Sequence, residues 1–236
     1  MYKVIAILTS VTGIIFTGPF LKKALADTDY PVLAPDIVNL IIDSTATLDR
    51  FREGRGVKTV APYIPKQIFK LARCVAVFPK ITKAALIVGA RFGDGIASCK
   101  NESGQWSRPA FFNLLGGSVG IQAGILDREM VMLFVNENAV NKLKNGVVKE
   151  GKDLKIVAAF NSKGEEEDQI GDKDILVYLS DKGMYAGLTL NGRLIIEDRS
   201  QNIEYYRENI DVKSILSDFN TSLDGKNVQA FLHLLP

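Results

Sequence analysis

The chain has 236 residues, of which 47% are apolar and 24% are charged, an ordinary composition for a protein with a hydrophobic core. This composition argues against a largely disordered chain. The formal net charge is only +2 and His233 is the sole histidine. We therefore expect no nucleic-acid partner, no metal site and no cofactor.

The first 26 residues are typical of an export signal. Lys3 is followed by the apolar run Val4–Phe16, and Ala24-Leu25-Ala26 matches a cleavage pattern of small residues. The alternative is an uncleaved anchor, but the run is shorter than the ~20 residues that span a bilayer. We predict a signal peptide at 1–26 and an exported protein, periplasmic or secreted and able to lie on a membrane. Residues 27–236 would then hold 26 basic and 27 acidic residues.

The pattern along the chain changes from helical to β after about residue 73. Apolar residues recur at helical spacing over 35–53, and Pro65 suits the start of a short helix over 65–72. Alternating or continuous apolar runs then predict strands at 75–78, 84–90, 96–99, 110–115, 117–125, 130–135, 154–160, 175–179, 184–190 and 193–197. Short helices are expected at 138–145, within 205–216 and at 228–235.

Several turns are predicted between these strands. Pro79 would end the first strand, and Gly93-Asp94-Gly95, Asp127-Arg128, Asp181-Lys182-Gly183 and Asn191-Gly192 would join neighbouring strands. The fold class is therefore α+β, with N-terminal helices packed on a glycine-rich, curled antiparallel sheet or a barrel-like sheet. Residues 27–236 would form one domain, with a core at about 35–218 and a helical C-terminal tail.

Two cysteines, Cys74 and Cys99, lie at the ends of predicted strands. In an exported protein an even pair predicts a disulfide, which would stabilise the fold by ~3 kcal/mol. Two buried free thiols are the alternative.

Basic residues concentrate in 50–91, which contains ten lysines and arginines and a single glutamate, Glu53. Such a run is usually a solvated surface, but it also fits an anionic partner such as a lipid surface. The candidate lipid-binding residues are Lys66, Lys70, Arg73, Lys80 and Lys83.

Evidence for catalysis is weak. Gly116–Gly120 matches the G-x-S-x-G pattern around Ser118, but the residues that follow favour a strand, whereas a nucleophile elbow needs a helix there. The acidic run Glu165–Asp168 lacks the spacing of a calcium loop and fits a solvated loop. Trp106 fits a core position better than a membrane-interface anchor. We expect no catalytic residue.

A series of short motifs resembles the SYLF domain family, also called DUF500. They occur in order at 72–79 (ARCVAVFP), 89–99 (GARFGDGIASC), 106–109 (WSRP), 116–124 (GGSVGIQAG), 130–136 (MVMLFVN), 183–192 (GMYAGLTLNG) and 202–206 (NIEYY). The resemblance implies a non-enzymatic lipid-binding module related to yeast and animal proteins that bind phosphoinositides and, in some cases, actin. Bacterial members are commonly exported.

Together these observations predict an exported protein without enzymatic activity that binds anionic lipid through its basic N-terminal region. The alternative is an envelope scaffold that binds a protein partner and not lipid. The helix over 36–53 is acidic at its start and basic only at Arg50 and Arg52. It therefore differs from a lysine-rich lipid-binding helix.

Overall fold

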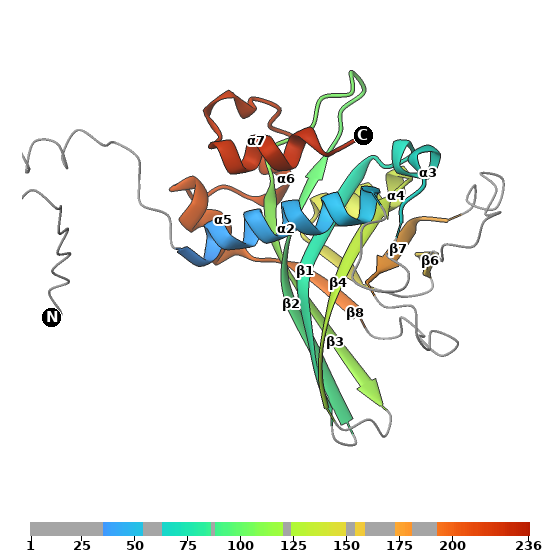
Figure 1. The fold of residues 1–236 in the computed structure, drawn as a ribbon. Helices are drawn as coiled ribbons and strands as arrows, with labels where there is room; N and C mark the ends of the chain where they lie inside the picture. Colours follow the sequence, from blue (N-terminus) through green and yellow to red (C-terminus); the bar gives the residue numbers. More distant parts are fainter. Residues whose placement is uncertain are drawn as a thin grey trace, which may run out of the picture. The chain divides into compact units, whose positions relative to one another are not determined.

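The computed structural model describes residues 35–53, 63–85, 88–119, 124–149, 154–158, 173–180 and 193–236. The chain divides into two compact units, Met1–Leu33 and Ala34–Pro236, and every described residue belongs to the second. In that unit helices pack on a curled sheet (Figure 1), which confirms the predicted α+β class. The predicted signal at 1–26 lies outside the described residues, and the single-domain assignment of 27–236 stays a prediction.

The described strands form one eight-stranded sheet in the order β5-β8-β3-β2-β1-β4-β7-β6. Neighbouring strands are antiparallel except β6 and β7, which pair in parallel and make the sheet mixed. The strands are β1 (Cys74–Ala85), β2 (Val88–Cys99), β3 (Ala110–Val119), β4 (Gly124–Phe134), β5 (Val147–Lys149), β6 (Ile156–Ala158), β7 (Ile175–Leu179) and β8 (Arg193–Glu197).

Strands β1, β2 and β4 are longer than predicted, because one predicted strand end and two predicted turns are wrong. Pro79 lies inside β1. Its backbone has no N–H to donate to the neighbouring strand, and the pairing with β2 is irregular between Val77 and Thr82, which accommodates it. Gly93-Asp94-Gly95 lies inside β2. There a Cβ on Gly95 would lie 2.5 Å from the Val77 carbonyl oxygen, so glycine permits a close approach of β2 to β1. Asp127-Arg128 lies inside β4, paired with β1.

Most helices agree with the sequence pattern, but α5 (Arg199–Tyr206) begins six residues before the helical segment predicted within 205–216. The predicted helix over 35–53 is confirmed as α2 (Pro35–Glu53), and Gly146, with φ +77°, follows α4 as a C-terminal glycine should. Asn136 caps α4 by accepting a hydrogen bond from the Ala139 N–H at 3.1 Å. The other helices are α3 (Lys66–Lys70), α4 (Glu137–Lys144), α5 (Arg199–Tyr206), α6 (Val212–Ile215), the 3-10 turn η2 (Thr221–Leu223) and α7 (Lys226–His233).

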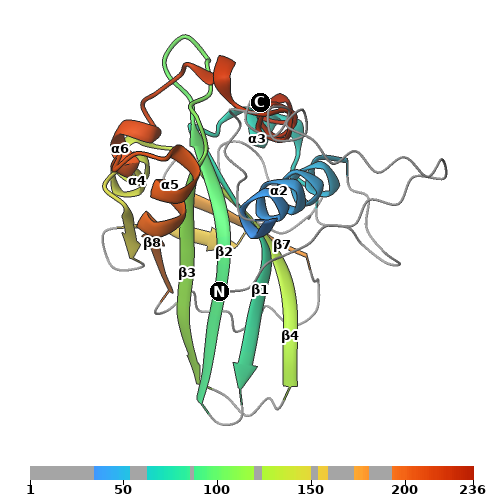
Figure 2. The ribbon, with the colours of Figure 1, turned by 90° about the vertical axis from the view of Figure 1, so that its left-hand side faces the viewer.

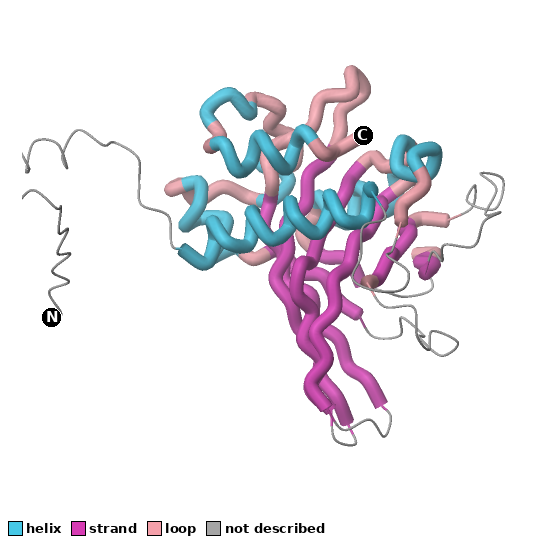
Figure 3. Tube along the Cα trace, in the orientation of Figure 1, coloured by secondary structure: helices cyan, strands magenta, loops and turns pink. Residues whose placement is uncertain are grey.

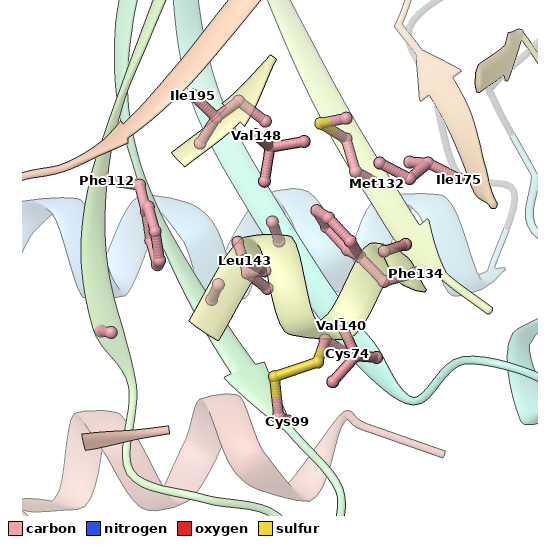
Figure 4. Close-up of a cluster of buried hydrophobic side chains, with 14 of the residues drawn as sticks. Cys74, Cys99, Phe112, Met132, Phe134, Val140, Leu143, Val148, Ile175 and Ile195 are labelled. Carbon is pink, nitrogen blue, oxygen red and sulfur yellow. A yellow bond between two sulfur atoms is a disulfide. The ribbon is translucent and has the colours of Figure 1, made fainter. Parts of the chain in front are cut away.

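Alternation along the strands divides the core into two clusters, one on each face of the sheet. On β4, Met132 and Phe134 belong to the first cluster and Val131 and Leu133 to the second. Figure 4 shows the first cluster, where Val140 and Leu143 of α4 meet strand residues. The second cluster receives apolar residues of α2, α3 and α7, whose helices lie on the other face in Figure 2.

The predicted disulfide is present. Cys74 and Cys99 pair directly across β1 and β2, their sulfurs are bonded, and both residues are buried in the first cluster (Figure 4). The bridge fastens the ends of the two strands nearest the helices.

Some predictions fall outside the described residues. These are the turns Asp181–Gly183 and Asn191–Gly192, the strand 184–190 and the acidic run Glu165–Asp168. Figure 3 draws these parts in grey, and the described elements that precede and follow them are the strands β6, β7 and β8. Strands β7 and β8 have the predicted bounds 175–179 and 193–197.

Candidate functional site

Helix α3 presents two lysines to solvent on a well-anchored turn. Ile68 and Phe69 are buried in the second core cluster, whereas Lys66 and Lys70 are exposed. Pro65 precedes the helix, and its carbonyl accepts a hydrogen bond from the Phe69 N–H at 2.9 Å. The buried apolar side chains therefore hold α3 against the core. Its two lysines are one helical turn apart and remain available to a partner.

The surface beside α3 is partly apolar. Tyr63, just before α3, has 37% of its surface exposed, and Ile42 of α2 has 44%. The segment that leads to α3 is fastened to the end of α2 by the Ile64 N–H, which donates to the Phe51 carbonyl at 2.8 Å. We call the exposed residues of α2 and α3 together with Tyr63 the helical surface.

Helix α2 contributes little free positive charge to this surface. Arg50 forms an ion pair with Glu129 of β4, and the Thr47 hydroxyl donates to the same carboxylate at 3.1 Å. Asp43 is exposed on α2 and Asp49 is half-buried. The acidic character that the sequence indicates for this helix is therefore retained on the surface.

A groove runs between α2 and α7 on the same face of the sheet. Its volume is about 440 Å³. The residues that line it are mostly apolar or small: Ile42, Thr45, Ala46, Asp49, Asn227, Ala230 and Leu234. The sequence analysis did not find this groove, because it arises from the packing of two helices that are almost two hundred residues apart.

The five candidate lipid-binding residues do not form one patch. Arg73 is exposed but is paired with Glu137 at the start of α4. Lys80 is exposed in the middle of β1. At ~3.3 Å per strand residue, Lys83 lies roughly 30 Å further along the chain than Arg73. Only Lys66 and Lys70 are brought together on one short element.

Arg108 and Asp224 form a partly buried ion pair that attaches the C-terminal segment to the sheet. The Arg108 Nη2 and Nε donate to Asp224 Oδ1 at 2.9 and 3.1 Å, and Arg108 Nη1 lies 3.5 Å from Asp218. The guanidinium also stacks over the Tyr206 ring at 4.3 Å. Burial raises the pKa of Asp224, and it raises the pKa of Tyr205 to about 12.

Trp106 belongs to the same attachment. Its indole N–H donates to the Pro236 carbonyl at 3.0 Å, and its ring packs against the second core cluster. Trp106 and Arg108 of the WSRP motif therefore both hold the C-terminal helices in place.

Ser118 is not in a nucleophile elbow. It lies within β3 with its backbone paired to Gly89, and the next described element is strand β4, whereas an elbow needs a helix. His233 is exposed in the last turn of α7. The described residues contain no group of three or more histidine, cysteine or acidic side chains that could hold a metal. Among the described helices, none has the length and hydropathy of a membrane span.

The structure is an α+β domain in which helices pack on both faces of a curled sheet. Residues 115–235 match the family described as "Ysc84: Las17-binding protein actin regulator". The chain belongs to this Ysc84 family, which confirms the SYLF resemblance. No solved structure matches the chain.

Relatives with curated descriptions occur in yeast and animals. LAS seventeen-binding protein 3 of Saccharomyces cerevisiae is 28% identical over 159 residues, which cover 65% of this chain and 34% of the relative. SH3 domain-containing YSC84-like protein 1 of Homo sapiens is 26% identical over 156 residues, 65% of this chain and 45% of the relative. The chain thus matches less than half the length of these relatives.

Proposed function

We propose that this protein is a non-enzymatic, peripheral binding protein that attaches to anionic lipid surfaces through its helical surface. The observation that supports this most directly is α3, where buried Ile68 and Phe69 hold exposed Lys66 and Lys70 outward. Each lysine near an anionic leaflet contributes ~1 kcal/mol. Tyr63, which directly precedes α3 and is 37% exposed, would enter the headgroup region and add apolar burial.

The site of action in this proposal is outside the cytoplasm. The export pattern at 1–26 supports this location. The protein would then be periplasmic or secreted and would lie on a membrane surface. Lys80 lies apart from these lysines in the middle of β1, and Arg73 is paired with Glu137, so both would contribute less.

Salt dependence tests the proposal. Exposed charges are screened within ~8 Å at physiological ionic strength, so co-sedimentation with anionic vesicles should fall as salt rises. Neutral phosphatidylcholine vesicles should sediment much less protein. Equal sedimentation with neutral and anionic vesicles, or binding that salt does not alter, would contradict the proposed mechanism.

A protein partner is the second candidate function. The family description and the name of the yeast relative both refer to binding of a protein. In this alternative the domain is a scaffold without direct lipid binding. Two results together would favour this alternative. The protein would stay in the supernatant with every vesicle, and a variant with reversed charge at Lys66 and Lys70 would still bind its protein partner.

A further inference from the structure

The groove between α2 and α7 contains apolar surface that none of the described residues covers. Its volume is about 440 Å³. Ile42 on its α2 side is 44% exposed, and Leu234 on its α7 side is half-buried. Ala46 and Ala230 also line the groove, and their small, exposed side chains leave space between the two helices. A groove of this kind accepts the side chains of another helix.

Both helices are held against the protein by their other sides, so the groove is already formed before a partner binds. Ile41 of α2 and Phe231 of α7 are buried in the second core cluster. The Thr45 hydroxyl, in the lining of the groove, donates to the Ile41 carbonyl at 2.7 Å. Its donor is therefore used within α2, and a partner need not satisfy it. A preformed groove loses little conformational freedom on binding, which favours association.

Helices α2 and α7 run in the same direction along the groove, as Figure 1 shows. The lining residues follow in order along both helices, so Ile42 and Asn227 lie at the same end of the groove. Asp43 is adjacent to Ile42 in the chain, and Lys226 is adjacent to Asn227. An acidic residue of α2 and a basic residue of α7 therefore lie at the same level along the two helices.

The two helices carry opposite charge on their exposed sides. The exposed charged residues of α2 are all acidic, namely Asp36, Asp43 and Glu53. The exposed residues of α7 include the basic residues Lys226 and His233 and no acidic residue. Complementary charge across an interface favours one partner and one orientation over others. By charge, the exposed side of α2 therefore matches the exposed side of α7 and repels a second α2.

We infer that a second copy of this chain covers the groove, with α2 of each copy packed on α7 of its partner. A two-fold axis parallel to the helices produces this arrangement, because it exchanges the two helices and keeps their direction. Asp43 of each copy then lies beside Lys226 of the partner subunit. A two-fold axis across the helices places α2 on α2 and brings acidic residues together, so charge selects the first arrangement.

The interface between the two copies is small. With 19 residues, α2 is ~28 Å long, and a helix with its side chains is ~10 Å wide. Two such helix pairs bury on the order of 1,000 Å² in total, at the lower limit of specific interfaces. We therefore expect a weak, reversible dimer that forms at micromolar concentrations. Lys66 and Lys70 do not line the groove, so this inference goes beyond the membrane proposal and does not depend on it.

Sedimentation velocity of the full chain, without vesicles, tests the dimer. The wild type should change from monomer to dimer as its concentration rises from about 1 to 300 µM. Ile42→Glu places a charge in the apolar groove and should weaken the dimer about tenfold or more. Val147→Glu introduces the same charge at a residue that is 47% exposed on β5, and should dimerise as the wild type does. Equal dimerisation of all three proteins, or equal losses in both variants, would overturn the inference. A wild type that stays monomeric would also overturn it and would leave the groove to a different helical partner.

Exchange of one charge pair tests how the helices are arranged in the dimer. Asp43→Lys and Lys226→Asp should each weaken the dimer severalfold, because like charges then face each other. An acidic residue suits the start of α7, so Lys226→Asp should still fold. The double variant Asp43→Lys/Lys226→Asp restores opposite charges in both symmetric contacts and should dimerise within about twofold of the wild type. Unchanged dimerisation in the single variants, or no recovery in the double variant, would contradict the packing of α2 on α7 of the partner.

Discussion

Arg108 and Asp224 are joined by two hydrogen bonds although 116 residues separate them in the chain. The Asp224 side chain is only 1% exposed, so this pair holds the C-terminal segment against the start of β3 from inside the protein. Removal of one partner leaves the other buried with less compensation.

Asp224→Ala should therefore lower the free energy of unfolding by about 3 kcal/mol. Glu137→Ala, which breaks the exposed Arg73 pair, should cost less than about 1 kcal/mol. Urea denaturation of the two variants measures this difference. Equal effects would show that the buried pair does not hold the C-terminal segment.

Alkaline pH should weaken the fold through the same region. Burial raises the pKa of Tyr205 to about 12, so above about pH 10 the unfolded chain releases a proton that the folded chain keeps. Stability is fully present below about pH 10 and is lost as the pH approaches 12, by on the order of 2 kcal/mol for this group. Tyr205→Phe should show a smaller fall in Tm between about pH 9 and 12, and an unchanged slope would refute this assignment.

Gly95 should not tolerate a side chain. A Cβ there would lie 2.5 Å from the Val77 carbonyl oxygen and 2.5 Å from Phe78 Cδ1, both in the packed interior. Gly95→Ala should cost more than about 2 kcal/mol, because β1 and β2 must move apart.

Gly225 offers the matched control. It precedes α7 with nothing within 4 Å of an added Cβ, and serine is a better helix cap than glycine. Gly225→Ser should be neutral or slightly stabilising in the same denaturation experiment. A mild effect at Gly95 would mean that the close approach of β2 to β1 is not needed.

The disulfide should contribute measurably to stability. Cys74 and Cys99 are 25 residues apart, and a loop of that length corresponds to about 3 kcal/mol in the chain-entropy view. The double variant Cys74→Ala/Cys99→Ala should lose about that much free energy of unfolding. Reduced wild-type protein with the same midpoint as oxidised protein would contradict this expectation.

Local patterns predicted some elements accurately and misplaced others for identifiable reasons. Helix α2 and strands β7 and β8 were predicted with their bounds, because periodicity and flanking turn residues agree there. Strand β1 was cut at Pro79 because proline normally ends a strand, and the irregularity that accommodates it depends on pairing with β2. The glycines of β2 predicted a turn, whereas in the structure they allow β2 to approach β1 closely.

The same limits apply to the candidate sites. The exposed lysines of α3 could be predicted, since Ile68 and Phe69 define its buried side. The distance of Lys83 from these lysines could not be predicted, because Lys83 lies in the long strand β1, which the sequence pattern divided into two strands.

The most direct test of the membrane proposal is co-sedimentation of a charge-reversed variant with anionic vesicles at low salt. Lys66→Glu/Lys70→Glu should reduce the bound fraction severalfold, because two favourable contacts become repulsive. The control Lys149→Glu/Lys213→Glu changes the net charge equally at exposed positions on β5 and α6, and should bind as the wild type does. Equal binding by all three proteins, or an equal loss in both variants, would contradict attachment through the helical surface.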